Sequence, residues 1–285
     1  TNAHISIPNI VRSVLKDVGY DENYSIFEDI GKQSQDIDLG TNNHIAGAGD
    51  NGMMFGYACN DTDKYLPKAM VILQEFARMY DEERIKNNNL LPDGKAQITG
   101  EYDNDFNLKG IETFTICYQN LEIDRKYTDS IIIGMIQYLT EKYGLNAPKN
   151  ILLNPTGRFR VGGFLGDAGV TGRKIAVDNY HSFSHIGGGA FSGKDPTKVD
   201  RSGAYKAREI AINYLKKYNL KWCEVQLSYS IGIRRPMGIY INSNIGYIEP
   251  ETSLYKDCEP HNIIHDLDLL NKKYEELARF GHFTK

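Results

Sequence analysis

The apolar residues of this chain recur with two different periods. In several long stretches they return every three or four positions, which is the period of a helix with one buried face. Pro8 near the start of the first stretch and Gly19 directly after it are typical of helix ends. We therefore expect helices over the following ranges: 8–18, 65–86, 124–143, 201–218 and 261–279.

Short runs of apolar and β-branched residues predict strands between these helices. The predicted strands cover 24–30, 96–102, 110–118, 151–153, 223–231 and 238–242. Pro92-Asp93-Gly94-Lys95 is expected to form a turn. Strand pairs with accompanying helices indicate an α+β fold, in which helices cover mixed sheets. The recurring unit also indicates internal structural repetition, although no sequence repeat is strong enough to establish it.

Composition and charge narrow the class of protein. The 285 residues are 41% hydrophobic and 25% charged, which is typical of a soluble globular protein. A formal net charge of −4 argues against a general nucleic-acid binder. No apolar run is long enough to span a membrane, and no secretory segment opens the chain. The four cysteines form no C-x-x-C pair, so we expect reduced thiols in a cytoplasmic protein.

The segment Gly187–Ser202, called the glycine-rich segment below, carries the strongest chemical signal. Four of its glycines fall within seven positions, and a helical pattern begins near its end. The glycines are followed by alternating cations and carboxylates: Lys194, Asp195, Lys198, Asp200 and Arg201. Glycines let the backbone approach a ligand, and the free N–H groups of a new helix attract an anion. With lysines for charge and aspartates for a divalent metal, the segment predicts a polyphosphate site.

Two alternative interpretations of this segment are weaker. Gly188–Lys194 matches G-x-x-x-x-G-K, the phosphate loop of nucleotide hydrolases, but Asp195 stands where that loop needs Ser or Thr. Pro196 also interrupts the helix that should follow, and no hydrophobic strand directly precedes the glycines. A flexible surface linker would not need so many charged residues at such close spacing.

The turn Asn154–Phe159 presents a cation beside an aromatic ring. The Phe159 ring could stack on a purine, and the Arg158 guanidinium could reach a phosphate. A core phenylalanine beside a solvated arginine explains the same residues equally well, so both interpretations stay open.

Two other glycine-rich stretches each enclose an aspartate. Gly163–Lys174 surrounds Asp167 with glycines and ends in the adjacent cations Arg173 and Lys174. A basic, glycine-rich region in a mildly acidic protein indicates an anionic ligand. Gly47–Gly52 encloses Asp50, for which a simple turn is the alternative.

Taken in order, four motifs resemble those of S-adenosylmethionine synthetases (methionine adenosyltransferases). They are Gly47–Ala58, Asn154–Phe159, Gly166–Lys174 and Gly187–Tyr205, and the resemblance covers essentially the whole chain. It implies that the sulfur of L-methionine attacks the ribose C5′ of ATP. The triphosphate leaves in one piece and is then cleaved to pyrophosphate and phosphate. The resemblance also implies Mg²⁺, two ions per site, and K⁺.

The same resemblance implies an architecture. It predicts three structurally similar α/β domains in a pseudo-threefold arrangement and a homodimer, or a dimer of such dimers, with active sites between subunits. Residues 1–46 would be the remainder of an N-terminal domain with a gate loop over the site. Residues 47–161 would form the central domain and residues 162–285 the C-terminal domain.

Site residues follow from the matching motif positions. The residues that would contact ATP are Asp50, Asp93, Gly94, Lys95, Arg158, Phe159, Asp167, Arg173, Lys174, Ala190 and Lys194. Those that would contact methionine are Gln33, Asp167 and Lys198, and Asp200 would bind Mg²⁺. The catalytic residues would be Asp167, Arg173 and Lys194, with Arg173 acting in triphosphate cleavage. Gly94 stands where the family usually has alanine.

This chemistry agrees with the residue types. A thioether is a neutral nucleophile that needs no general base, so the charge that grows on the triphosphate is what must be stabilised. Many Lys, Arg and Asp residues without a catalytic triad are therefore expected.

The sequence departs from the family pattern at its N-terminus. The family opens with a His-Pro-Asp-Lys segment, which supplies a histidine for phosphate and an aspartate for metal, and none precedes Thr1 in this sequence. We therefore expect this chain by itself to turn over slowly or not at all. The alternative is a truncated, catalytically impaired relative that binds nucleotide or regulates a complete subunit with which it pairs.

Overall fold

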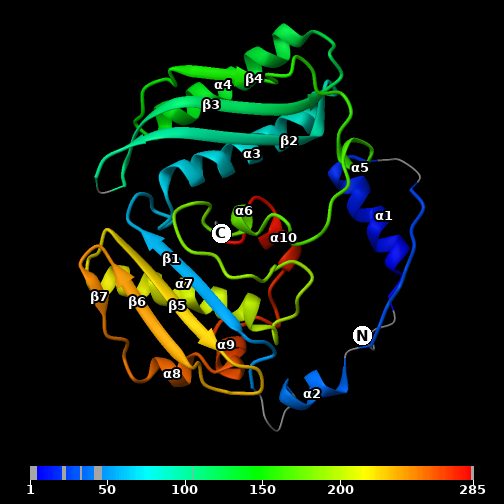
Figure 1. The fold of residues 1–285 in the computed structure, drawn as a ribbon. Helices are drawn as coiled ribbons and strands as arrows, with labels where there is room; N and C mark the ends of the chain where they lie inside the picture. The colour runs from blue at the N-terminus through cyan, green and yellow to red at the C-terminus, as the bar shows by residue number, and fades with distance from the viewer. Residues whose placement is uncertain (1–4, 21–23, 33, 42–46, 105, 284–285) are drawn as a thin grey trace. The chain divides into compact units, whose positions relative to one another are not determined.

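The computed structural model describes residues 5–20, 24–32, 34–41, 47–104 and 106–283. The chain divides into two compact units (Figure 1). The first unit comprises Thr1–Ser34, Glu75–Glu101 and Gly110–Ala168. The second comprises Gln35–Gln74, Tyr102–Lys109 and Gly169–Lys285. Each unit has its own sheet.

The first unit is built on a three-stranded sheet in the order β2-β3-β4. Its strands are β2 (Leu90–Tyr102), β3 (Leu108–Asn120) and β4 (Asn150–Leu153), and β4 runs parallel to β3. Its helices are α1 (Ile7–Val18), the second half of α3 (Lys68–Lys86), α4 (Arg125–Lys142) and α5 (Gly163–Gly166). The Phe76 ring of α3 lies 5.7 Å from the buried Phe114 ring of β3. Apolar side chains of α4, including Ile132 and Ile136, are fully buried.

The second unit contains a four-stranded antiparallel sheet in the order β1-β5-β6-β7. Its strands are β1 (Gly52–Cys59), β5 (Trp222–Tyr229), β6 (Gly238–Ser243) and β7 (Gly246–Ile248). The long helix α7 (Val199–Lys217) covers one face, and Ala204, Ala207 and Ile210 are buried there. Gly56 is essential to this packing, because a Cβ atom on it would overlap the backbone of Ala207 and Arg208.

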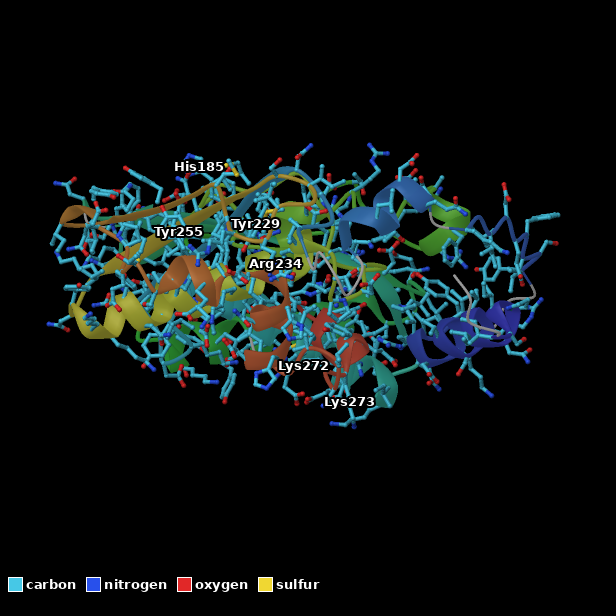
Figure 2. All side chains as sticks on the ribbon, turned by 90° about the horizontal axis from the view of Figure 1, so that it is seen from below. His185, Tyr229, Arg234, Tyr255, Lys272 and Lys273 are labelled. Atoms are coloured by element: carbon cyan, nitrogen blue, oxygen red, sulfur yellow. The ribbon has the colours of Figure 1, made fainter. Side chains whose placement is uncertain are left out.

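Short helices complete the second unit: α2 (Gln35–Thr41), α6 (Ile175–Asp178), α8 (Leu254–Asp257), α9 (Pro260–Asp266) and α10 (Tyr274–Ala278). The prediction of one helix over 261–279 is wrong, because the chain leaves the helix at Leu267. Asp268 has a left-handed φ of 49°, and Leu269 N donates to Ile264 O at 2.9 Å. This Schellman motif ends α9 and buries Leu269. Lys272 and Lys273 follow, with exposed side chains (Figure 2).

Two further predictions are wrong. Tyr24–Ile30 is not a strand, because the segment pairs with neither sheet. Phe27 within it is 93% exposed. Pro92–Lys95 is not a turn but the first part of β2. There, sheet pairing overrides local turn propensity, and Pro92 is tolerated because β2 is an edge strand.

The other predicted helices and strands are confirmed, with ends that differ by up to six residues. The strands β1 and β7 and the short helices α2, α5, α6 and α8 are additions. The α+β class, with helices covering sheets, is confirmed as well. None of the helices among the described residues combines the length and apolar character that a bilayer crossing needs.

Candidate active site

The glycine-rich segment lies in the second unit and is tied to the first turn of α7. Asp200 stands in that turn, and its carboxylate forms an ion pair with the Lys194 ammonium. The Asp200 side chain is 13% exposed and the Lys194 side chain 30% exposed. The structure therefore brings together a predicted phosphate ligand and the predicted metal ligand.

Glycines let this segment approach its neighbours closely. A Cβ atom on Gly189 would overlap the Asp200 carboxyl group, and one on Gly187 would overlap the Met53 carbonyl oxygen. Ala190, predicted to present its backbone to ATP, lies beside Gly172, where a Cβ atom would come within 2.8 Å of the Ala190 methyl carbon. The glycine-rich segment thus meets the end of the Gly163–Lys174 stretch directly before Arg173.

The other predicted ligands in the second unit reach solvent. The Arg173 and Lys174 side chains are exposed and form no hydrogen bond or ion pair within the described part of the chain. The Lys198 ammonium lies 3.8 Å from the Asp195 carboxylate. Asp50 is exposed, and its Oδ1 accepts a hydrogen bond from the next backbone amide at 2.8 Å. The exposed Arg173 and Lys174 cations beside the segment are suited to a polyphosphate.

In the first unit, Asp93 fixes the backbone of a glycine pair. Its Oδ2 accepts a hydrogen bond from Gly163 N at 2.8 Å, and its own N–H donates to Gln119 Oε1 at 3.3 Å. Gly94 and Lys95 follow on β2 with exposed positions. One oxygen of the Asp93 carboxylate is therefore engaged by protein, while the Lys95 ammonium faces solvent.

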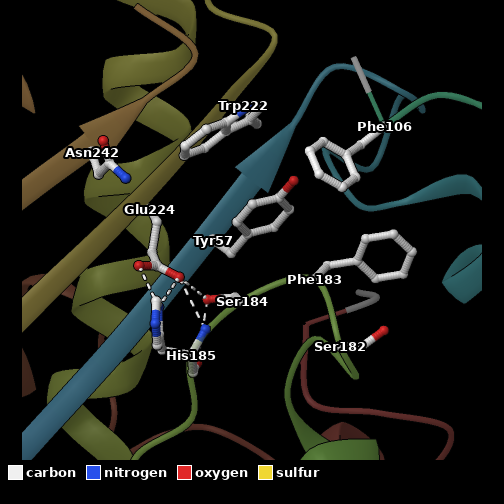
Figure 3. A pocket seen from close by; sticks show the side chains of 9 residues that line it. All are labelled: Tyr57, Phe106, Ser182, Phe183, Ser184, His185, Trp222, Glu224 and Asn242. Carbon is white, nitrogen blue, oxygen red and sulfur yellow. Dashed lines mark hydrogen bonds and ion pairs between the residues drawn. The ribbon is translucent and has the colours of Figure 1, made fainter. Parts of the chain in front are cut away.

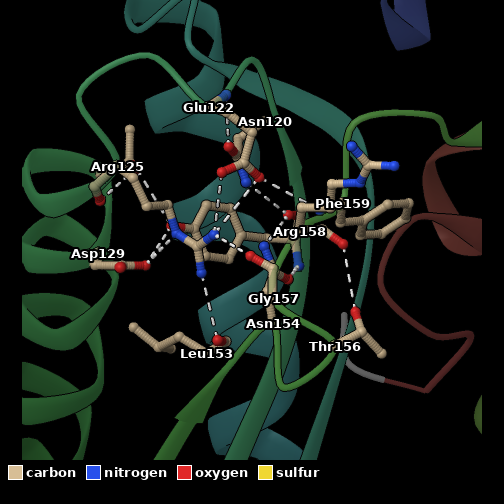
Figure 4. Close-up of polar contacts among 12 residues, drawn as sticks. Asn120, Glu122, Arg125, Asp129, Leu153, Asn154, Thr156, Gly157, Arg158 and Phe159 are labelled. Carbon is tan, nitrogen blue, oxygen red and sulfur yellow. Dashed lines mark hydrogen bonds and ion pairs between the residues drawn. The ribbon is translucent and has the colours of Figure 1, made fainter.

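The Asn154–Phe159 turn is anchored by its first residue. Tyr118 N donates to Asn154 Oδ1 at 2.8 Å, and Asn154 Nδ2 donates to Tyr118 O at 2.9 Å. Arg125 supports the same turn by donating to Leu153 O and Gly157 O, both at 3.3 Å (Figure 4). These contacts present the end of the turn, where Arg158 is exposed and Phe159 is half-buried. Part of the ring is thus accessible to a stacking ligand.

Replacing Asn154 tests this anchor. We expect Asn154→Ala to destabilise the first unit by about 2–3 kcal/mol, because two buried backbone groups of Tyr118 each lose a hydrogen bond, although Tyr118 O keeps the one from Asn120 Nδ2 at 3.2 Å. Alanine also tolerates the left-handed φ of 44° poorly. Asn154→Gly removes the same hydrogen bonds without that strain, so it should cost less. Urea unfolding followed by circular dichroism measures both; losses below about 0.5 kcal/mol would contradict the anchor.

Two predicted methionine contacts fall elsewhere. Asp167 is exposed directly after α5, where its backbone N–H donates to Gly163 O at 3.1 Å. Gln33 lies outside the described residues, as do residues 42–46 of the predicted gate. The described part of the gate contains α2.

Two family models match this chain and together span nearly all of residues 45–285. Residues 45–159 match the central domain of S-adenosylmethionine synthetase, and residues 161–285 match its C-terminal domain. The chain belongs to the S-adenosylmethionine synthetase family. Every predicted site residue except Gln33 lies within the matched ranges. The boundaries of the three predicted domains stay a prediction, as do the individual roles of the site residues.

Asp200 is the predicted protein ligand of Mg²⁺. Among the described residues, no group of three or more His, Cys, Asp or Glu side chains could hold a metal ion. Mg²⁺ usually keeps several waters and is bound by one or two carboxylates together with substrate phosphates. In this chain the single Asp200 carboxylate beside a cationic segment therefore fits Mg²⁺ that is held jointly with a polyphosphate.

A cavity of about 440 Å³ lies on the other face of the second unit's sheet (Figure 3). Its walls include Tyr57, Trp222 and the buried Glu224, and none of the predicted site residues lines it. Burial raises the pKa of Glu224, but hydrogen bonds from the His185 amide, the Ser184 hydroxyl and the His185 ring outweigh it, so the pKa lies below its ordinary value. Glu224 is thus held as a carboxylate that organises residues 184–185.

Two residues of these motifs have structural roles that their sequence context does not predict. Asn154 opens the motif in which Arg158 and Phe159 are the candidate ligands. Asparagine tolerates left-handed backbone, and this property was the signal that Asn154 could anchor the turn. Arg201 was noted only as a charge, and no sequence pattern distinguishes a buried arginine from a solvated one.

His282 makes stability depend on pH. Its Nδ1 lies 2.9 Å from the Tyr205 hydroxyl, and burial, helped by the Arg201 charge, lowers its pKa to about 4. Protonation therefore favours the unfolded state, whose histidine titrates near 6.5. Stability is complete above about pH 6.5 and is lost as the pH falls toward about 4.

We expect this loss to reach about 2–3 kcal/mol at pH 4. His282→Gln, which cannot protonate, should lack that share of the pH dependence. Urea midpoints of both proteins between pH 4 and 8 provide the measurement, and parallel curves would contradict the assignment.

Proposed function

We propose that this chain binds ATP and L-methionine and forms S-adenosyl-L-methionine. The methionine sulfur attacks the ribose C5′, the C5′–O bond breaks, and the triphosphate departs and is then cleaved to pyrophosphate and phosphate. The observation that carries the proposal is the Lys194–Asp200 pair beside a closely packed glycine loop, in a chain of this family. We place the reaction in the cytoplasm.

The protein's own groups would act on the leaving group. Lys194 would exchange the Asp200 carboxylate for a phosphate oxygen, and the exposed Arg173 and Lys174 would add donors. Preorganised cations of this kind lower the barrier because charge accumulates on the triphosphate as the bond breaks. Arg173 would also act in the later cleavage. Asp200 would hold Mg²⁺, which when bound neutralises phosphate charge.

Residues of the first unit would contact the adenine ring and further phosphate groups of ATP. Phe159 would stack on the purine with Arg158 beside it, and Lys95 would reach the nucleotide from β2. Asp167 would contact both substrates, while Gln33 and Lys198 would contact methionine. Holding the sulfur, C5′ and the leaving oxygen in line would supply the rest of the acceleration.

We also propose that the chain works as a homodimer with active sites between subunits. The sheet of the second unit has one face on α7, whereas its other face exposes Met53, Tyr240 and Tyr247. Exposed apolar surface of this kind favours association with a partner. A dimer of dimers and K⁺ binding are further expectations of family membership.

Product analysis tests the proposal. The protein is incubated with ATP, methyl-labelled L-methionine, Mg²⁺ and K⁺, and products are identified by mass spectrometry. We expect a labelled adenosyl sulfonium together with pyrophosphate and phosphate in equal amounts. Release of ADP or AMP without the sulfonium would overturn the proposal. A low rate is compatible with it, because the identity and ratio of the products carry the test.

A further inference from the structure

Three hydrogen-bond donors converge on the carbonyl oxygen of Phe191 in the glycine-rich segment. Arg201 donates to it from Nε at 2.9 Å and also from Nη2. The backbone N–H of Lys194 donates to the same oxygen at 3.2 Å. Gly193, with a φ of 85°, makes the reversal between them possible. One acceptor thus joins the segment to α7 and fixes the backbone of Lys194.

Arg201 is an unusual donor to a backbone carbonyl, because its charged side chain is buried. It is 3% exposed, and within the described residues it pairs with no carboxylate. Instead its guanidinium lies 4.2 Å from the centre of the Tyr274 ring and 6.0 Å from that of Tyr205. A buried cation is costly unless hydrogen bonds and ring faces offset its lost hydration. The arrangement therefore makes the Phe191 carbonyl a rigid point.

The Phe191 side chain is enclosed as well. Its ring centre lies 5.0 Å from that of His282 and 5.7 Å from those of Tyr205 and Phe283. Backbone and ring are therefore both held, and neighbouring Ala190 is held with them.

Two tethers connect the segment to the first turn of α7: the Arg201–Phe191 contact and the Lys194–Asp200 ion pair. In the proposed function Lys194 leaves Asp200 for a phosphate oxygen, so that ion pair must open when substrate binds. The Arg201–Phe191 contact uses neither of those side chains and can persist. Without it, the segment would lose both tethers to the first turn of α7 at once.

We propose that Arg201 is a positioning residue for the triphosphate site. It holds the Phe191–Lys194 turn in place while Lys194 exchanges Asp200 for phosphate. This inference rests on the proposed function, and it adds a residue that touches no substrate.

Hydrogen exchange combined with kinetics tests the inference. Arg201→Met should raise amide exchange across residues 190–194 at least tenfold and lower kcat/KM for ATP at least tenfold. The KM for methionine should stay within twofold of wild type. Arg201→Lys keeps the charge and one donor, so it should recover part of both effects, and it serves if Arg201→Met does not fold.

Arg208→Met is the matched control. Arg208 is another buried arginine of α7, but it donates to the carbonyls of Tyr57, Lys64 and Tyr65, outside the segment. This variant should lose stability without raising exchange across residues 190–194. Unchanged exchange there in both Arg201 variants would overturn the inference, and so would raised exchange with unchanged ATP kinetics. Release of ADP or AMP by the wild-type protein, without the sulfonium, would instead overturn the proposed function.

Discussion

Lys194→Ala is expected to lower kcat/KM for ATP by about 100- to 1,000-fold, which corresponds to about 3–4 kcal/mol of transition-state stabilisation. The reason is that Lys194 is the cation already held at the glycine-rich segment, beside the predicted metal ligand Asp200. Loss of one positioned donor of this kind acts where charge grows on the leaving triphosphate. The KM for methionine should change little, since the thioether carries no charge.

Steady-state kinetics with two matched variants checks this expectation. Lys194→Arg keeps the charge with a different geometry, so its loss should be smaller than that of alanine. Lys217→Ala removes another ion-paired lysine, at the end of α7, and should leave the kinetics unchanged. A kcat/KM of Lys194→Ala within threefold of wild type would show that Lys194 does not stabilise the leaving triphosphate.

Gly56→Ala is expected to destabilise the second unit by about 3 kcal/mol or more. A Cβ atom at this position would overlap backbone atoms of Ala207 and Arg208, so β1 and α7 would have to move apart. Backbone cannot yield as a flexible side chain can, and the contact lies in the centre of the core.

Gly238→Ala is the control for that substitution. Gly238 belongs to β6 of the same sheet, and a Cβ atom there would meet nothing within 4 Å. Thermal unfolding should therefore separate the two variants by many degrees. Similar midpoints for both would show that β1 and α7 are not in the close contact described.

The elements with strong local patterns could be predicted from the sequence. The helical period of α7 and the apolar run of β5 predicted these two elements, because α7 and β5 each bury one face against the other. The pairing of β1 with β5 could not be predicted, since it joins residues more than 160 positions apart. Pro92 was misassigned because its edge position in the sheet is a tertiary property. Asp268 was misassigned because a left-handed helix end usually carries glycine.

The candidate site was predictable only in its composition. The glycines and charges of the glycine-rich segment indicated a polyphosphate, and the motifs indicated the family. The sequence did not reveal that Gly189 packs on Asp200 or that Arg201 is buried under Tyr274. Both facts depend on where residues distant in sequence meet in the folded unit.

Binding of the leaving group tests the central claim, that the glycine-rich segment is part of a triphosphate site. Calorimetry would measure the binding of inorganic tripolyphosphate and of AMP to the protein, each with Mg²⁺. Competition of each with a non-hydrolysable ATP analogue would be measured in the same way. We predict that tripolyphosphate binds, competes with the analogue, and does so at least tenfold more tightly than AMP. Tight binding of AMP, with no binding or competition by tripolyphosphate, would contradict the account.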